Sequence, residues 1–397
     1  MITDMPRLDI LIYAHDGRGL GHASRSIGIG MALRRLYPSL RILFVSGCKI
    51  SQELIGDKPL DWLKLPSYET EVVEGKSKGI TGNSMFSDSD LGELRGAQIN
   101  KIVELYRPKV VLCDHTPQGK HRELVPALKA SGGSDTQWVL GVRGVVGGVP
   151  QAKSGLARQL FESHYSELLW YGDSFVLGHE HMHELRKQYG KDPVECGYVS
   201  RLSEFGDHRV ATAGSAKELA ATVAIPWLGE KSLMFVKRLA RSIARIGSVY
   251  GAWHIYVEGA DSAELKSLFS GLDYCRLERP SGRRYVDSLL TSRSALIYGG
   301  YNSIMDVLSL HIPAVVVLRK MQDNEQQIHL QKLRLAAGNL LLSVEESQVQ
   351  ENELTAALEA QMKGGVTATA TEQSEISLDG AERAAQQLYR ILQEAHR

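Results

Sequence analysis

Short apolar runs alternate along this chain with longer stretches of helical periodicity. Runs rich in valine, isoleucine and leucine predict buried strands in both halves of the sequence, at 8–14, 41–47, 109–114, 136–143, 174–178, 221–225, 253–259, 295–300 and 313–318. Strands that are apolar on both faces are typical of parallel sheets, whose two faces are covered by helices. The pattern therefore predicts an α/β protein built on parallel sheets.

The strand–helix series stops once and then restarts. The interruption is the polar segment 201–219, and a chain of 397 residues is too long for one ordinary core. We predict two doubly wound, Rossmann-like domains facing a cleft, residues 1–200 and 220–378, with 201–219 as the linker. Residues 379–397 form an amphipathic helix that we expect to pack back on the N-terminal domain.

Composition excludes several classes of partner. The 46 basic and 46 acidic residues leave no net charge, so no overall field favours nucleic acid or an anionic membrane. No apolar run reaches transmembrane length, and the N-terminus lacks an apolar signal core. The cysteines are far apart and favour buried free thiols in a reducing compartment: Cys48, Cys113, Cys196 and Cys275. We expect a cytoplasmic protein.

The first predicted strand runs into the glycine-rich sequence "GRGLGH", which ends at Gly21 and His22. Glycine lets the backbone turn sharply and approach a ligand closely. Ligands of open parallel sheets bind beyond the carboxyl ends of the strands, and a helix N-terminus there keeps an imidazole neutral. His22 is therefore a candidate base, with Asp114 as a second candidate or as the group that orients it. A simple helix cap explains His22 equally well at this stage.

The glycines fit a dinucleotide-binding motif poorly. Their order is G-x-G-x-G-H, and the second strand ends "FVSGCK" without the acidic residue that would hold a ribose. A nicotinamide or flavin enzyme is disfavoured.

A second motif follows the strand that ends near Tyr298. A glycine pair opens a helix whose free amides suit a diphosphate, a carboxylate one turn later suits ribose hydroxyls, and an amide-rich run suits a sugar. The candidates are Gly299, Gly300, Asn302, Ser303, Asp306, Gln326 and Gln327. The alternative is that Ser303-x-x-Asp306 is only a capping box, which stabilises a helix without any ligand.

Other candidates favour ordinary structural roles. Asp88 and Asp90 form a D-x-D sequence, but Asp90 fits a helix N-cap better than a metal ligand. The histidines of "GHEHMHEL" do not share a helical face, and the arginines of "RPSGRRYVD" fit an exposed loop; these are His179, His181, His183, Arg279, Arg283 and Arg284. Arg143 ends a predicted strand and is a candidate acceptor contact.

Five segments, in order, carry a resemblance to a known family. They are "GLGHASRSIGIGMALRR", "RPKVVLCDHTPQGKHRELVPAL", "ECGYVSRL", "GGYNSIMDVLSLHIPAVVV" with "DNEQQIHLQKL", and "LDGAERAAQQL". With these segments the chain resembles the GT-B glycosyltransferases of family 28, the MurG-like enzymes, and a related group of predicted bacterial glycosyltransferases. The resemblance implies an acceptor-side first domain and a nucleotide-sugar donor on the second.

The resemblance also assigns roles. Gly299, Gly300, Asn302 and Ser303 match the family's diphosphate-binding turn, Gln326 and Gln327 its sugar-binding stretch, and His22 the histidine of its N-terminal glycine loop. Asp306 stands where the family usually has a ribose-binding glutamate. The family's glycine-rich loop after the first strand of the second domain is replaced by "IPWLGEKS", in which Lys231 is a candidate phosphate contact.

Together these observations predict a metal-independent glycosyltransferase that uses a UDP-sugar and no cofactor. The acceptor is expected to be a hydroxyl of a glycan, a lipid-linked sugar or a natural product. Two alternatives stay open: a sugar-nucleotide epimerase or hydrolase, for which Asp16 and Asp114 are the obvious extra carboxylates, and a non-catalytic nucleotide-sugar-binding protein.

Overall fold

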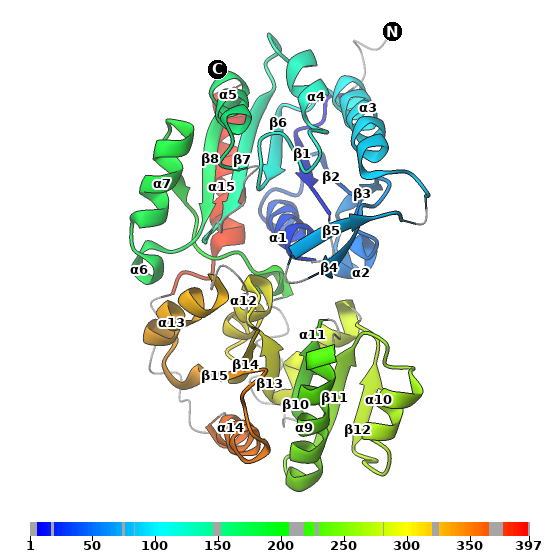
Figure 1. Cartoon of the computed structure of the whole chain (residues 1–397). Helices are drawn as coiled ribbons and strands as arrows, with labels where there is room; N and C mark the ends of the chain where they lie inside the picture. Colours follow the sequence, from blue (N-terminus) through cyan, green and yellow to red (C-terminus); the bar gives the residue numbers. More distant parts are fainter. Residues whose placement is uncertain are drawn as a thin grey trace. The chain divides into compact units, whose positions relative to one another are not determined.

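The structure is a computed structural model (Figure 1). It describes most of the chain, with the following residues covered: 6–16, 20–73, 76–82, 84–145, 152–205, 218–226, 230–280, 282–319, 325–364 and 376–395. The chain divides into two compact units, Met1–Glu204 with Asp379–Arg397, and Phe205–Leu378.

Unit 1 contains a seven-stranded sheet in the order β3-β2-β1-β6-β7-β8-β9, and all neighbouring strands pair in parallel. Its strands are β1 (Ile10–Ala14), β2 (Ile42–Ser46), β3 (Asp61–Lys64), β6 (Val110–Asp114), β7 (Gln137–Arg143), β8 (Tyr165–Tyr171) and β9 (Val194–Glu195). A separate antiparallel hairpin joins β4 (Glu69–Val73) to β5 (Lys76–Ile80). β1, β2 and β6 are buried throughout, as expected for strands covered on both faces.

The helices of unit 1 are α1 (Gly21–Leu36), α2 (Ser51–Ile55), α3 (Asp88–Tyr106), α4 (Val125–Ala130), α5 (Gly155–His164), α6 (Ser174–Leu177), α7 (Glu180–Tyr189), the 3₁₀ helix η1 (Arg201–Phe205) and α15 (Gly380–Glu394). The C-terminal helix α15 packs on α1, where Tyr389 stacks on Tyr37 with ring centroids 3.9 Å apart. Gly380 permits this path, because a Cβ there would lie 2.4 Å from the Gly197 carbonyl oxygen.

Unit 2 contains a six-stranded parallel sheet in the order β12-β11-β10-β13-β14-β15. Its strands are β10 (Leu219–Ile225), β11 (Ala252–Val257), β12 (Cys275–Glu278), β13 (Ser292–Tyr298), β14 (Ala314–Leu318) and β15 (Leu341–Glu345). Its helices are α9 (Glu230–Ile246), α10 (Ala263–Leu268), α11 (Gly282–Thr291), α12 (Tyr301–Ser309), α13 (Glu325–Ala337), η2 (Gly338–Leu340) and α14 (Glu351–Gly364). Apolar side chains of β10, β11 and α9 form much of its core.

The prediction of a strand at 174–178 is wrong. Residues 174–177 form the short helix α6, because the Asp173 carboxylate accepts a hydrogen bond from the Phe175 amide and Gly178 ends the turn with φ 72°. The strand lies earlier, at β8, where Glu167 interrupts the apolar pattern that sequence reading depends on.

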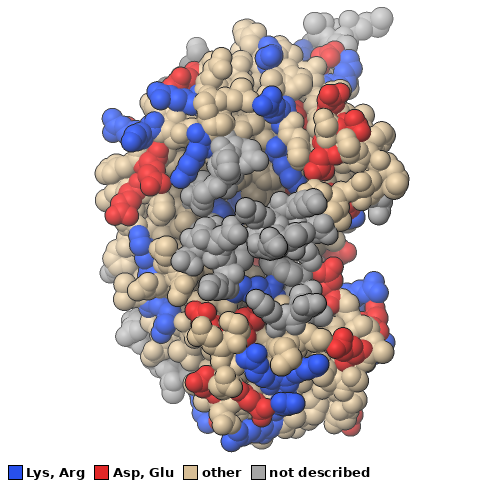
Figure 2. Space-filling view, in the orientation of Figure 1, with Lys and Arg blue, Asp and Glu red and all other residues tan. Residues whose placement is uncertain are grey.

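The predicted linker 201–219 is described in part. Residues 206–217 lie outside the described residues, 201–205 form η1 with Arg201 and Leu202 buried, and Leu219 begins β10. Among the described residues, every helix is too short or too polar to cross a membrane. Figure 2 shows basic and acidic side chains interspersed on the face in view, in keeping with the balanced composition.

Candidate active site

The carboxyl ends of three neighbouring strands in unit 1 carry ionisable groups. His15 follows β1, Asp114 ends β6 and Arg143 ends β7, and these strands are adjacent in the sheet. Parallel strands that lie side by side bring such terminal residues to one edge. Helix α1 begins directly after the glycine-rich loop and adds His22 in its first turn.

His22 and Asp114 form a hydrogen-bonded pair at this edge. His22 Nδ1 contacts Asp114 Oδ2, and the Asp114 side chain is 2 % exposed while that of His22 is 25 % exposed. Because an ionised carboxylate only accepts hydrogen bonds, Nδ1 carries the proton. The lone pair of the imidazole is then on Nε2, the nitrogen that does not face Asp114.

Arg25 completes the pair from one turn further along α1. Its Nη2 donates to Asp114 Oδ1 at 3.3 Å and lies 3.1 Å from His22 Nδ1, and the side chain is 3 % exposed. The buried carboxylate thus has a histidine on one oxygen and a guanidinium on the other. Sequence analysis missed Arg25, although its spacing of three residues from His22 places both on one helical face.

Three imidazoles meet beside Asp114. The ring centroid of His15 lies 3.9 Å from that of His22, and that of His115 lies 5.1 Å from it. Burial lowers the pKa of His22 well below its usual range, with Arg25, Arg143 and Lys120 adding to the effect. Burial likewise lowers the pKa of His15, and that of His115 to about 3. The rings are therefore neutral at physiological pH.

Three of these groups could also act as ligands of a metal cation. Ligating atoms of His15, His22 and Asp114 lie within 4.8 Å of one another. The Arg25 guanidinium already contacts two of these three side chains, and a second positive charge there would be repelled. The arrangement fits proton transfer better than metal binding.

The structure does not support the explanation of His22 as a helix cap. The N-cap of α1 is Leu20, without a side-chain hydrogen bond, and the His22 ring is directed to Asp114. Gly21 is the first residue of α1, whereas Gly17 and Gly19 of the motif lie outside the described residues.

The glycine pair of unit 2 lies where β13 turns into α12. The Gly299 amide donates to the Val317 carbonyl and the Gly300 amide to the Tyr298 carbonyl, so the backbone itself uses both donors. The glycine turn packs against the amide-rich run. A Cβ built on Gly299 would lie only 2.9 Å from Leu318 and 3.3 Å from Gln326 Oε1. Among the described residues other than its chain neighbours, no atom would lie within 4 Å of a Cβ on Gly300.

The capping box that was the alternative explanation of Ser303-x-x-Asp306 is absent. Helix α12 begins at Tyr301, its N-cap is Gly300, and no side chain caps it. Asn302 and Ser303 are half-buried in the first turn, and Asp306 is 7 % exposed in the second. Gln327 is exposed, and Asp323 and Asn324 lie outside the described residues.

Comparison with known proteins gives matches of structure alone. No protein-family model and no curated protein matches the sequence. MurG of Acinetobacter baumannii matches with a TM-score of 0.53 at 11 % identity, over 98 % of this chain and 99 % of that one. A putative UDP-N-acetylglucosamine 2-epimerase of Listeria monocytogenes matches with a TM-score of 0.61 at 12 % identity, over 97 % and 95 %.

The glycosyltransferase SnogD of Streptomyces nogalater matches with a TM-score of 0.55 at 14 % identity, over 98 % of this chain and 100 % of that one. Both parallel sheets, with their interleaved helices, are therefore shared across nearly the whole length. The chain has the GT-B fold. The fold prediction is confirmed, and GT-B proteins of this kind include glycosyltransferases and UDP-N-acetylglucosamine 2-epimerases.

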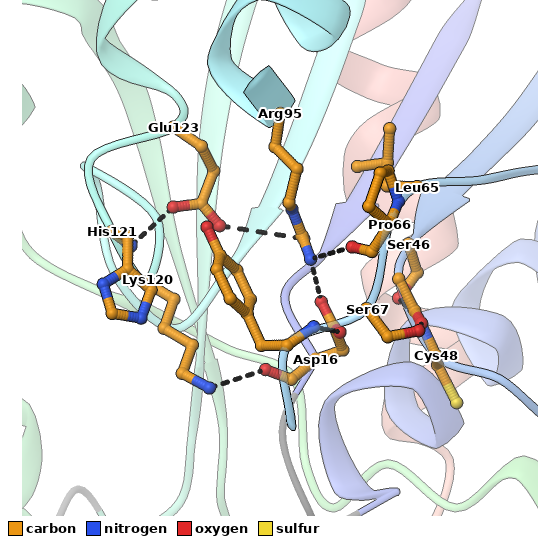
Figure 3. A network of polar contacts seen from close by, with 12 residues as sticks. Asp16, Ser46, Cys48, Leu65, Pro66, Ser67, Arg95, Lys120, His121 and Glu123 are labelled. Carbon is orange, nitrogen blue, oxygen red and sulfur yellow. Dashed lines mark hydrogen bonds and ion pairs between the residues drawn. The ribbon is translucent and has the colours of Figure 1, made fainter. Parts of the chain in front are cut away.

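The first GT-B unit also contains a buried ion network. Figure 3 shows Arg95 between the carboxylates of Asp16 and Glu123. Arg95 and Glu123 are fully buried, and the Tyr68 amide donates to Asp16 at 2.8 Å. Tyr13 donates its hydroxyl to Glu123 at 2.7 Å. Asp16, considered from sequence as a second carboxylate for catalysis, is thus engaged by Arg95 and Tyr68.

A second network, also missed from sequence, lies at the carboxyl edge of the other GT-B sheet. Arg319, directly after β14, binds both oxygens of Glu346 and donates to Ser232 at 2.9 Å. Tyr298 donates its hydroxyl to Glu346 at 2.7 Å, and the guanidinium lies 4.3 Å from the centre of its ring. The network fixes the end of β13, from which the glycine turn starts.

The remaining candidates have structural explanations where they are described. Asp90 is the third residue of α3, not its N-cap: Ser87 is the N-cap, and the two form a capping box. His179 and His183 are exposed at the start of α7, and among the described residues they form no metal-type group. The Arg279 guanidinium pairs with Asp261 in an exposed contact. Lys231 lies in the first turn of α9, and its side chain is outside the described part of the chain.

Proposed function

We propose that this chain is a metal-independent glycosyltransferase that moves a sugar from a nucleoside-diphosphate sugar, with UDP as the nucleotide, to a hydroxyl acceptor. The observation that carries the proposal is the His22–Asp114–Arg25 group at the carboxyl edge of the first sheet. The GT-B fold, shared with MurG, SnogD and UDP-sugar epimerases, supports the donor class.

In the proposed step His22 acts as the general base. The acceptor oxygen attacks the anomeric carbon, the bond from that carbon to the diphosphate oxygen breaks, and the acceptor proton goes to Nε2 of His22. Asp114 holds Nδ1–H and stabilises the imidazolium that forms, while Arg25 keeps Asp114 in place. Arg143 is proposed to contact the acceptor, because its charge acts on His22.

The second unit is proposed to hold the donor. The first-turn amides of α12 and the positive end of its dipole bind the diphosphate, and Gly300 leaves room for it. Asp306 binds the ribose, and Gln326 and Gln327 bind the sugar. Lys231, at the start of α9, is a proposed phosphate contact.

An epimerase or hydrolase is the second candidate, because UDP-N-acetylglucosamine 2-epimerases share the fold. Such an enzyme would need a further carboxylate near His22, but Asp16 is paired with Arg95. Within the described residues this leaves Asp114 as the carboxylate that contacts His22.

Incubating UDP-N-acetylglucosamine with and without a mixture of acceptors separates the possibilities. UDP release that requires acceptor supports transfer, a new or free sugar without acceptor supports epimerisation or hydrolysis, and binding without turnover supports a binding protein.

Asp306→Ala should weaken UDP binding about 10- to 150-fold, the effect of losing a hydrogen bond to a charged group. Gly300→Val should weaken it about tenfold or more, because its side chain would fill the space proposed for the diphosphate. A φ of −72° suits a valine, and among the described residues other than its chain neighbours no atom lies within 4 Å of a Cβ at this position. Titration calorimetry with UDP measures both, and thermal unfolding of each variant is the control. Affinities equal to that of the parent chain would remove Asp306 and Gly300 from the donor site.

Turnover should persist in EDTA. We expect at most a small change in rate, because α12 amides stabilise the leaving diphosphate and Arg25 disfavours a cation between His15, His22 and Asp114. The measurement is UDP release after dialysis against EDTA, followed by addition of magnesium or manganese. Loss of turnover that the metal restores would contradict the mechanism and point to these three groups or to Asp88 and Asp90.

A further inference from the structure

Unit 1 contains a groove that the proposed mechanism does not use. Its volume is about 890 Å³, within the range of small-molecule sites. Its walls are the start of α3, the segment 118–126 that follows β6, and the residues around the start of α5.

The wall formed by segment 118–126 is held in a fixed conformation. Arg122 has a φ of 64°, a left-handed value that costs a non-glycine residue free energy and persists where the surroundings determine it. The residues on either side of Arg122 are tied together, because the buried Glu123 carboxylate accepts a hydrogen bond from the His121 amide at 2.5 Å (Figure 3). Gly92 lets α3 close against this segment, because a Cβ there would lie 3.0 Å from His121 Cβ. Such a wall presents side chains in set directions, as a binding site requires.

The charged groups of the groove favour an anion. Lys120 and Arg122 line it, and Glu93 is the acidic residue among the lining side chains. Burial lowers the pKa of Lys120 although Asp16, Asp88 and Glu123 act in the opposite direction, so its ammonium is incompletely solvated. An ammonium has three N–H donors; Lys120 donates one of them to the Asp16 carbonyl at 3.3 Å, and its Nζ also lies 4.8 Å from the centre of the Tyr68 ring. An anion in the groove would compensate the lost solvation.

Lys120 links the groove to the surroundings of the proposed base: its Nζ donates to the carbonyl of Asp16, and the ring of the preceding residue, His15, lies 3.9 Å from that of His22. Lys120 lines the groove, and the charge of Lys120 contributes to the lowered pKa of both His22 and His15. The segment that forms the wall continues from His115, whose ring lies 5.1 Å from that of His22. A ligand bound through Lys120 is therefore held by a side chain that contacts the residue next to His15, the imidazole that packs on His22.

We propose that this groove binds the acceptor, and that the acceptor carries a phosphate or carboxylate group held by Lys120 and Arg122. The proposal rests on the transferase function proposed above, and it narrows the acceptor from any hydroxyl compound to an anionic one. A phosphate and a carboxylate would both supply the anionic group, and the test below distinguishes between them.

The test measures binding of three probes to the full chain by calorimetry, with UDP at saturation to occupy the donor site. The probes are glucose 1-phosphate, glucuronate and, as the neutral reference, methyl glucoside. Either or both anions should bind more tightly than methyl glucoside. Lys120→Gln/Arg122→Gln should weaken anion binding about 30-fold or more, the effect of losing two charge-assisted hydrogen bonds, and leave UDP affinity unchanged.

The matched control is Lys129→Gln/Arg158→Gln, which removes the same charge from exposed positions on α4 and α5 outside the groove. It should bind each anion as the parent chain does. Preference for glucose 1-phosphate alone assigns a phosphate acceptor, and preference for glucuronate alone assigns a carboxylate. Anion binding no tighter than that of methyl glucoside, or equal loss in both double variants, would overturn the proposal.

The test also distinguishes failure of this inference from failure of the transferase function. If anions bind through Lys120 and Arg122 but the chain turns over no donor, the anion site is supported and the transferase function is contradicted. If acceptor-dependent turnover is unchanged in Lys120→Gln/Arg122→Gln, the transferase function is supported and the anion site is contradicted.

Discussion

His22→Ala should lower acceptor-dependent UDP release by about 100- to 10,000-fold, the usual contribution of a general base. The reason is that Nε2 is the nitrogen that does not face Asp114 in a neutral imidazole whose other nitrogen is held by that carboxylate. Affinity for UDP should stay within about twofold, because the donor site is proposed on the other unit. The measurement is a comparison of turnover and of UDP binding by calorimetry.

The pH profile gives a second readout of the same substitution. Since burial and Arg25 lower the pKa of His22, the base stays unprotonated through neutral pH, and turnover of the parent chain should fall only in clearly acidic solution. That acidic limb should be missing from His22→Ala. His179→Ala is the matched control, because His179 is exposed and its side chain makes no capping bond; it should keep full turnover and the full profile.

Asp114→Asn tests the pair as a unit. An asparagine can offer an N–H to Nδ1 and stabilise the wrong tautomer, so turnover should fall to a similar extent. The double variant should then be little worse than either single variant, because the two residues act together. Near-full turnover of His22→Ala would transfer the role of base to Asp114 and contradict the proposed mechanism.

The fold was predictable because its strongest signal is periodic. Runs such as those of β1, β6 and β14 are apolar throughout, and a fully buried parallel strand produces that pattern without help from distant residues. The pattern failed at β8, where Glu167 sits in a strand, and at 174–177, where a capping aspartate converts an apolar run into a helical turn. Both failures depend on contacts that a linear pattern does not contain.

The candidate site was predictable only in part. His22 and Asp114 could each be named because Asp114 ends a strand and His22 follows the glycine-rich loop after another, and adjacency of β1 and β6 brings them together. Arg25, His15 and His115 were missed because their significance comes from shared burial around one carboxylate. Arg95 was missed for a similar reason: its partners lie 79 and 28 residues away, and only the folded chain shows that it neutralises both.

Arg95→Met should destabilise unit 1 by about 3–5 kcal/mol, which is the typical cost of removing one partner from a buried ion pair. Arg95 is fully buried, and its loss removes from Asp16 and Glu123 the guanidinium that pairs with both in a region shielded from water. The methionine itself fills most of the vacated volume, so the loss comes from charge and not from a cavity. For a unit of this size the melting temperature should fall by about 6 to 20 °C.

Two further variants separate this explanation from a general loss of packing. Arg158→Met breaks an exposed pair with Glu162 on α5 and should cost no more than about 1 kcal/mol. Asp16→Asn/Arg95→Met/Glu123→Gln removes all three charges and should recover much of the stability, because no uncompensated charge remains buried. Urea unfolding followed by hydrogen exchange in β1 and α3 measures each effect within unit 1. If the triple variant proved no more stable than Arg95→Met, the cost would lie in packing, and the network of Figure 3 would not be held by charge.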